Sequence, residues 1–187
     1  MKTKDLAYIA LFAAITAVLG LVPAVQVGPV PITAQTLGVM LAGSILGARR
    51  GFLSQLLFLV LVAVGLPVLP GGGGGLAVFA GATAGYLISW PIAAFVIGLL
   101  TERVWTRYTL AWGVLANVVG GIVVVYAIGV PVLQLVTGLP WEKAFWLGAA
   151  VFIPGDLLKA VIAAAIAVQV RRSYPVIERP QRMAAVR

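Results

Sequence analysis

Asp156 and Lys159 are two ionisable side chains inside an otherwise apolar stretch near the carboxyl end of the chain. Charged groups are costly in the hydrocarbon of a bilayer, so they usually face the interior of a helix bundle and pair or bind something. A spacing of three residues places both on one helix face. Asp156 also follows Pro154 in a first helical turn, where free backbone N–H groups favour a negative charge. The pattern predicts a ligand site or, alternatively, an ion pair that only joins two helices.

Uncharged hydrogen-bonding residues for the same site follow the first connector rich in glycine and proline, at Thr33, Gln35 and Thr36. A second connector contains five consecutive glycines, residues 71–75, which permit close approach of the backbone to a ligand or serve only as a flexible link. This run does not fit the G-x-G-x-x-G pattern, and no Gly-Lys-Ser/Thr follows it. We therefore expect no ATP site, and any uphill work requires an outside source of energy.

The composition argues against a soluble protein and against most enzyme chemistry. Of the 187 residues, 62% are hydrophobic and 10% are charged, whereas soluble domains carry roughly 25% charged residues. The sequence has no cysteine and no histidine, which removes disulfides, thiol and imidazole chemistry and the commonest zinc ligands. Asp156 is the one acidic residue within a predicted membrane span, so an acid–base or metal constellation is missing. We expect no enzyme activity, no metal and no cofactor.

Six apolar stretches predict an all-α integral membrane protein, a single domain over residues 1–187 with six transmembrane helices. The mean hydropathy of +1.11 agrees with this class. The second stretch is short and is expected to lie against its neighbours, away from lipid. Connectors are predicted at turn-forming residues, among them 129–131, and a helix is expected to restart at Pro154. The predicted spans are residues 6–23, 33–48, 51–69, 76–99, 110–130 and 145–170.

The basic residues predict how these helices are oriented. With six spans, one side of the membrane receives eleven of the thirteen basic residues, the other side receives Lys143, and Lys159 remains inside a span. Positively charged loops stay in the cytoplasm, so both termini of this multi-pass protein of the cell membrane are predicted to be cytoplasmic. The same placement at membrane borders argues against binding of nucleic acid. The eleven residues are Lys2, Lys4, Arg49, Arg50, Arg103, Arg107, Arg171, Arg172, Arg179, Arg182 and Arg187.

The first predicted helix carries a stripe of small residues, spaced three or four apart, that can pack closely against another helix in lipid. The stripe serves either packing within the chain or docking of a partner subunit. Its residues are Ala7, Ala10, Ala14 and Ala17. Most tryptophans, Trp90 among them, lie near predicted span ends, which is typical of an aromatic belt at the membrane surface.

Five segments together resemble the BioY family, the biotin-binding S components of energy-coupling-factor (ECF) transporters. The resemblance extends over about residues 6–170, and GPVPIT and PGDLLK in this order and separation are its most specific part. The segments are 28–39 (GPVPITAQTLGV), 41–51 (LAGSILGARRG), 65–68 (GLPV), 81–88 (GATAGYLI) and 152–159 (FIPGDLLK).

The resemblance implies a six-helix S component that captures biotin near the outer face of the membrane. Its implied partners are a transmembrane coupling subunit and a pair of cytoplasmic ATPases. In the family, an A-x-x-x-A pattern on the first helix meets the coupling subunit, and Ala10 and Ala14 match that pattern. The fold, the ligand and the partners named here are expectations that follow from the resemblance.

The resemblance also implies a biotin site. The acidic residue and the lysine of its PGDLLK segment correspond to Asp156 and Lys159, and Thr33, Gln35 and Tyr86 lie in two other matching segments. We expect Asp156 to accept a hydrogen bond from a ureido N–H of biotin and Lys159 to donate to a ligand oxygen. Two alternatives remain: an S component for a different vitamin, and a self-sufficient secondary carrier that uses Asp156.

Overall fold

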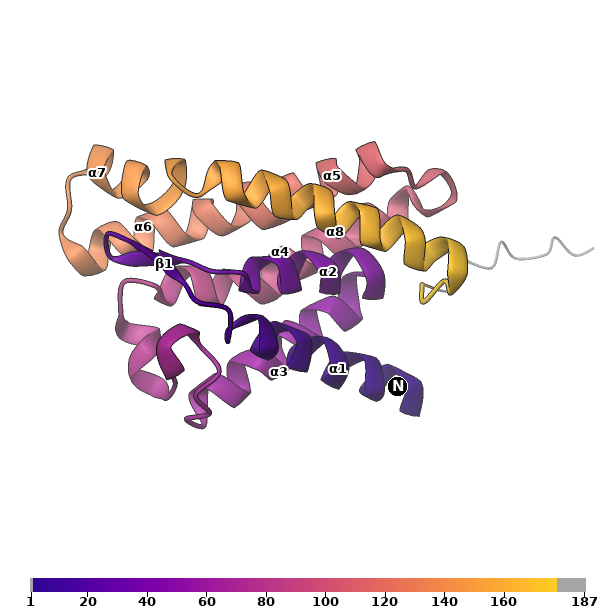
Figure 1. Cartoon of the computed structure of the whole chain (residues 1–187), viewed down its shortest axis with the longest axis horizontal. Coiled ribbons are helices and arrows are strands. Elements are labelled where there is room, and N and C mark those ends of the chain that lie inside the picture. Colours follow the sequence, from indigo (N-terminus) through magenta and orange to yellow (C-terminus); the bar gives the residue numbers. More distant parts are fainter. Residues whose placement is uncertain (1, 178–187) are drawn as a thin grey trace, which may run out of the picture.

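The computed structural model describes residues 2–177 as a bundle of helices that run roughly along its long axis (Figure 1). The start of α1 and the end of α8 lie at one end of the bundle, and α7 and the β-hairpin lie toward the other (Figure 1). Arg179, Arg182 and Arg187, which were predicted to belong to the cytoplasmic tail, lie outside the described residues. The α-helices are α1 Thr3–Leu19, α2 Gln35–Leu46, α3 Ala48–Ala63, α4 Ala84–Arg103, α5 Leu110–Val118, α6 Val125–Thr137, α7 Trp141–Phe145 and α8 Ile153–Ser173.

Two long helical stretches contain π-helical turns. The turn η4 Val119–Val124 joins α5 to α6, and η5 Trp146–Ala150 follows α7 ahead of α8. Three stretches of the described chain are long and apolar enough to cross a membrane: Ala84–Arg103, Leu110–Thr137 and Trp141–Ser173. A mainly helical chain with helices fit for a membrane is therefore confirmed, while the count of six spans stays a prediction.

Helix α2 lies inside the bundle. Ten of its twelve residues are buried, and it packs against α1, α3, α4 and α8. The next helix starts almost at once, because Gly47 takes a φ of +84° that lets the chain reverse direction between α2 and α3. The prediction that the second apolar stretch lies against its neighbours is confirmed.

The glycine-rich segment between α3 and α4 differs from the predicted spans. Helix α3 ends at residue 63, not 69, and α4 begins at residue 84, not 76. Between them the chain forms two 3-10 turns, η1 Pro70–Gly72 and η2 Leu76–Ala80, so the loop occupies more of the sequence than expected. Backbone angles available mainly to glycine interrupt the helical course, with positive φ at Gly65, Gly71, Gly72 and Gly75.

The connector predicted at residues 129–131 is wrong, because these residues lie within α6, which continues to Thr137. Gly129 instead allows α4 and α6 to pack closely, since a Cβ at this position would overlap the ring of Tyr86. Pro131 stays inside the helix, as membrane helices tolerate when neighbouring groups satisfy the freed backbone.

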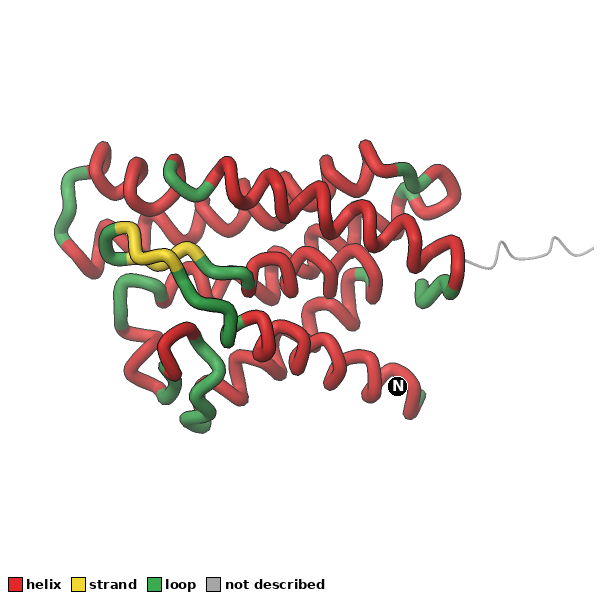
Figure 2. The backbone as a smooth tube through the Cα atoms, viewed as in Figure 1, coloured by secondary structure: helices red, strands yellow, loops and turns green. Residues whose placement is uncertain are grey.

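A β-hairpin and the start of the last helical stretch also differ from the sequence prediction. Strands β1 Val25–Val27 and β2 Val30–Ile32 form an antiparallel hairpin that was not predicted, shown in yellow in Figure 2. The last helical stretch begins at Trp141, ahead of the predicted residue 145. It is interrupted before α8, which restarts with Pro154 in its first turn, as predicted.

Basic residues from distant segments meet at the end of the bundle that holds the start of α1. Arg50 of α3 pairs with Asp5 of α1 at 3.2 Å and donates to a backbone carbonyl beyond α8. Arg171 of α8 donates to two carbonyls in the turn between α4 and α5. Lys143 belongs to α7, at the opposite end (Figure 1). The segregation of charge expected from the sequence is therefore present in the described part of the fold.

The crossing of α4 over the turn between α2 and α3 depends on Gly98. A Cβ at this position would overlap the backbone nitrogen of Ala48, and backbone atoms cannot move aside as a flexible side chain can. We expect Gly98→Ala to lower the free energy of unfolding by about 1–3 kcal/mol through overpacking. Gly155→Ala is the matched control, because a Cβ there meets nothing within 4 Å. Thermal unfolding in detergent, followed by circular dichroism, measures both, and equal melting temperatures would contradict the close crossing.

Candidate functional site

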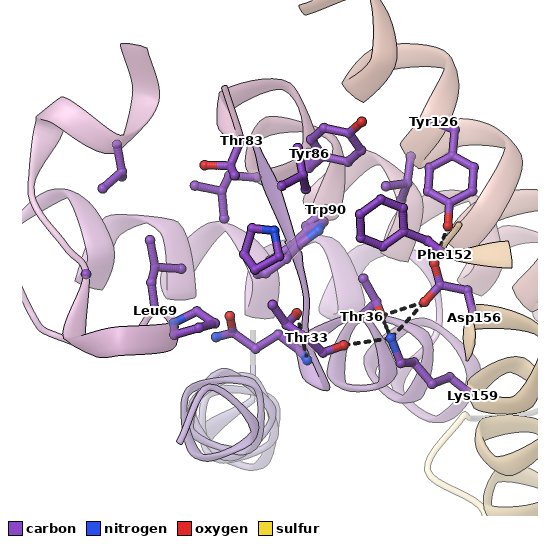
Figure 3. Close-up of a pocket in the computed structure, with 18 residues that line it drawn as sticks. Thr33, Thr36, Leu69, Thr83, Tyr86, Trp90, Tyr126, Phe152, Asp156 and Lys159 are labelled. Carbon is purple, nitrogen blue, oxygen red and sulfur yellow. Dashed lines mark hydrogen bonds and ion pairs between the residues drawn. The ribbon is translucent and has the colours of Figure 1, made fainter. Parts of the chain in front are cut away.

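A cavity of about 240 Å³ lies toward the end of the bundle that carries the hairpin and the glycine-rich segment. Its walls come from β2, the start of α2, the segment 69–83, and helices α4, α6 and α8 (Figure 3). The lining is mostly apolar or aromatic with a few polar groups, which is the usual make-up of a site for a small molecule. The five side chains that were predicted to contact a ligand all line it: Thr33, Gln35, Tyr86, Asp156 and Lys159.

Lys159 and Asp156 form a hydrogen-bonded cluster at the α8 wall of the cavity. The Lys159 ammonium donates to Oδ1 of Asp156 at 2.8 Å, to the hydroxyl of Thr36 at 2.9 Å and to the carbonyl of Thr33 at 2.6 Å. Thr36 also donates to Oδ1 of Asp156, and Tyr126 of α6 donates to Oδ2. The dashed lines in Figure 3 show this cluster. The charges thus connect α8 with α6 and with the start of α2.

Both charged side chains are largely removed from solvent. The exposed fraction of the side chain is 5% for Asp156 and 16% for Lys159. Asp156 lies in the first turn of α8, where the helix dipole stabilises its negative charge. The pair joins helices and also lines the cavity, so the geometry is compatible with both predicted roles, and contact with a ligand stays a prediction.

Gln35, the first residue of α2, connects three parts of the chain beside the cavity. Its amide nitrogen Nε2 donates to the carbonyl of Thr16 in α1 at 3.1 Å and to the carbonyl of Val68 at 3.0 Å. Its backbone N–H donates to the hydroxyl of Thr33 at 3.3 Å. These bonds hold the side chain in one orientation in the cavity wall.

Tyr86 supplies part of the aromatic wall from the first turn of α4. Its hydroxyl donates to the carbonyl of Gly148 at 2.7 Å, and its ring packs where a Cβ on Gly129 would stand. Phe152 lies close to Tyr126, with ring centroids 6.5 Å apart. Rings from three helical segments therefore give the cavity flat apolar surfaces.

The aromatic residues Tyr126 and Trp90 are among those of this site that sequence analysis missed. Tyr126 contacts Asp156 from 30 positions away, and no spacing rule links residues on different helices. Trp90 was assigned to an aromatic belt at the membrane surface, but it is 4% exposed and lines the cavity, so that assignment is wrong. Trp112 and Trp141 are 46% and 60% exposed. Burial of a tryptophan in a bundle depends on helix rotation, which the sequence does not show.

The buried pair leads to a prediction about stability. Asp156→Asn or Lys159→Met alone leaves one buried charge without its partner, which is strongly destabilising. The double variant removes both charges. We therefore expect it to lose less free energy of unfolding than the two single variants lose together, by about 0.5–3 kcal/mol. Unfolding titrations with sodium dodecyl sulfate in mixed micelles measure the free energy of unfolding of the wild type, the two single variants and the double variant.

The ion pair of Asp5 and Arg50 serves as the control for this cycle. The two side chains are 24% and 20% exposed, and pairs that water reaches couple weakly. We expect a smaller coupling energy for Asp5→Asn combined with Arg50→Met. Strictly additive losses at Asp156 and Lys159 would contradict the account of a mutually dependent buried pair.

The chain is similar to known proteins over nearly its whole length. The family model described as the BioY family matches residues 1–176. A protein from Rhizobium etli named biotin transporter BioY is 52% identical over 95% of this chain and 98% of its own length. A Rhodobacter capsulatus protein of the same name is 48% identical over 92% of this chain and 95% of its own.

A solved structure shows the same fold. It is a crystal structure described as the S-component for biotin from an ECF-type ABC transporter, and its TM-score to this chain is 0.88. The two chains are 33% identical, and the match covers 94% of this chain and 97% of the other. With a family model that matches most of its residues and relatives this similar, the chain belongs to the BioY family.

Proposed function

We propose that this chain is the high-affinity biotin-binding S component of an ECF vitamin uptake transporter. The observation that carries the proposal is the buried cluster of Asp156 and Lys159 in the wall of a largely apolar cavity, in a chain of the BioY family. Relatives named biotin transporters and the biotin S-component of similar fold support it.

Biotin fits the chemistry of the cavity. Its fused rings and aliphatic chain need apolar walls, and its ureido group offers two N–H donors and one carbonyl acceptor. Oδ2 of Asp156 accepts only from Tyr126 among the described residues, so a carboxylate lone pair is open for one ureido N–H. Oε1 of Gln35 accepts the second. Charge-assisted bonds such as the first contribute roughly 1.5–3 kcal/mol.

The other predicted contacts act around this pair of acceptors. Lys159 donates to a ligand oxygen by exchanging one of its three present partners. Thr33 positions both Lys159 and Gln35, through its carbonyl and its hydroxyl. Tyr86 contributes its ring, because its hydroxyl hydrogen is already given to Gly148.

We further propose six membrane-spanning helices with both termini in the cytoplasm. Arg50 of α3 and Arg171 of α8 lie at the end of the bundle that holds the start of α1, and positively charged ends remain in the cytoplasm. The cavity lies toward the other end, where it takes biotin from outside. Energy for uptake comes from partners, a transmembrane coupling subunit and cytoplasmic ATPases.

The coupling subunit docks on the small residues of α1. Ala10 and Ala14 are exposed, whereas Ala13 beside them is 1% exposed and packs inside the bundle. Of the two roles predicted for the stripe, packing within the chain therefore does not apply to Ala10 and Ala14 in the described structure. Small exposed residues let a second helix approach closely in lipid.

Calorimetric titration of the purified chain in detergent with biotin tests the ligand and the site together. We expect tight binding by the wild type and a loss of about tenfold or more in Asp156→Asn, because a neutral amide replaces the charged acceptor. Asp5→Asn, a change of the same type at the other end of the bundle, should keep wild-type affinity. No binding by a folded wild type would reject biotin in favour of another vitamin, and equal affinity of Asp156→Asn would reject this site.

The docking proposal predicts a separate defect. Ala10→Leu combined with Ala14→Leu places branched side chains on the exposed face of α1, so co-purification with the coupling subunit and ATPases should fall at least several-fold while biotin binding is unchanged. Ala165→Leu, at an exposed alanine of α8, is the matched control. Full co-purification of the α1 variant would place the partner elsewhere. Counterflow of biotin in liposomes that lack the ATPases would indicate a self-sufficient carrier instead.

A further inference from the structure

Two fully buried side-chain polar atoms of the cavity-lining residues have no hydrogen-bond partner within residues 2–177. They are the side-chain oxygen Oε1 of Gln35 and the indole nitrogen Nε1 of Trp90. Gln35 is 1% exposed and Trp90 is 4% exposed, and both line the cavity. Buried polar groups are nearly always paired, so an unpaired one in a cavity wall points to a group that comes from outside the chain.

The orientation of the Gln35 amide follows from its partners. Nε2 lies 3.1 Å from the carbonyl oxygen of Thr16 and 3.0 Å from that of Val68. Only the NH₂ group of an amide can donate to two carbonyl oxygens, so the opposite assignment would place three acceptors together. Oε1 is therefore a fixed acceptor that no described residue uses.

The indole of Trp90 is also fixed in its position, in this case by packing. Its ring packs against Phe58, with centroids 5.6 Å apart, and both belong to the main apolar core. Figure 3 shows Trp90 on the wall that α4 forms, while Asp156 and Lys159 belong to the α8 wall. An indole N–H is a donor only, and here it has no acceptor in the described chain.

The lysine and tyrosine donors of the cavity are already engaged. All three N–H groups of Lys159 have partners, and the hydroxyl hydrogens of Tyr86 and Tyr126 are given to Gly148 and Asp156. Without breaking any of these bonds, the lining offers acceptors on Asp156 and Gln35 and a nitrogen donor on Trp90, beside the hydroxyls of Thr33 and Thr83.

This set is the complement of a cyclic urea, which has two N–H groups and one carbonyl. We propose that Trp90 is a specificity-determining residue whose indole N–H donates to the ureido carbonyl oxygen of the bound ligand, while Asp156 and Gln35 accept from the two ureido N–H groups. The inference rests on the proposed function and identifies the part of the ligand that Trp90 contacts. A carbonyl oxygen has two lone pairs, so Lys159 can donate to the same atom.

The contact adds selectivity because a ligand that lacks the carbonyl leaves the indole N–H unpaired. Sites built to pair with a polar group reject analogues that lack it far more strongly than apolar pockets reject a missing methylene. In 2-iminobiotin an imine that is protonated near neutral pH, and so has no lone pair to accept, replaces the ureido carbonyl. The preference for biotin over this analogue at neutral pH should therefore depend on Trp90.

Trp90→Phe tests this, since it removes the N–H and keeps an aromatic ring. Calorimetry with biotin and with the imine analogue 2-iminobiotin gives an affinity ratio for each protein, in which general packing effects cancel. We expect Trp90→Phe to reduce the ratio about five- to tenfold, as for one hydrogen bond. The phenyl ring is smaller than the indole that packs in the core, so the ligand-free variant should melt at a lower temperature, and the affinity ratio, in which this effect cancels, carries the test. Trp112→Phe, on the exposed face of α5, should keep the wild-type ratio.

A ratio unchanged by Trp90→Phe overturns this inference and leaves the proposed function standing, whereas failure of the wild type to bind biotin rejects both. If Trp90→Phe does not fold, nuclear magnetic resonance of the wild type with ¹⁵N-labelled tryptophan decides. One of the five indole N–H signals should move downfield when biotin binds, and also with desthiobiotin, which keeps the cyclic urea but lacks the sulfur. No such movement with biotin overturns the contact.

Discussion

The need to neutralise Asp156 and Lys159 inside an apolar bundle is the constraint on which the cavity depends. Buried charges are stable only with an opposite charge and with hydrogen bonds for their remaining donors and acceptors. Lys159 obtains them from the carbonyl of Thr33 and the hydroxyl of Thr36, and Asp156 obtains one from Tyr126. The start of α2, α6 and α8 are therefore brought together around one cluster, and the cavity lies among them.

Close packing at glycine residues fixes the part of the cavity wall that Tyr86 forms. Helices in lipid gain little from the hydrophobic effect, so small residues at their contacts decide how near they come. Gly129 of α6 and Gly148 of the η5 turn both border Tyr86, where any Cβ would overlap its ring or its hydroxyl. The carbonyl of Gly148 also accepts from that hydroxyl. One aromatic residue of α4 is thus held by glycines from two other segments, which gives the cavity a rigid side.

The sequence predicted the charged part of the site better than its aromatic part. Asp156 and Lys159 stand out because ionisable residues are rare in apolar runs, and their spacing alone places them on one face. Tyr126 and Trp90 have no such signal, since their roles depend on how α6 and α4 rotate toward α8. The connector predicted at residues 129–131 was wrong because glycine and proline occur both in turns and, within membrane helices, at close helix contacts. The helical class followed from composition, whereas the limits of α3 and α4 depended on glycine backbone angles that composition does not reveal.

Helix α1 has two faces that suit the two proposed tasks, capture of a ligand and docking of a partner. On its inner side, the carbonyl of Thr16 accepts from Gln35 in the cavity wall, and such a side must keep polar groups buried and paired. On its exposed side, Ala10 and Ala14 present a smooth apolar strip, which suits a second helix only if no polar group interrupts it. The two demands conflict on one surface but not on opposite faces of one helix. The proposed ligand and the proposed partner can therefore be held at the same time.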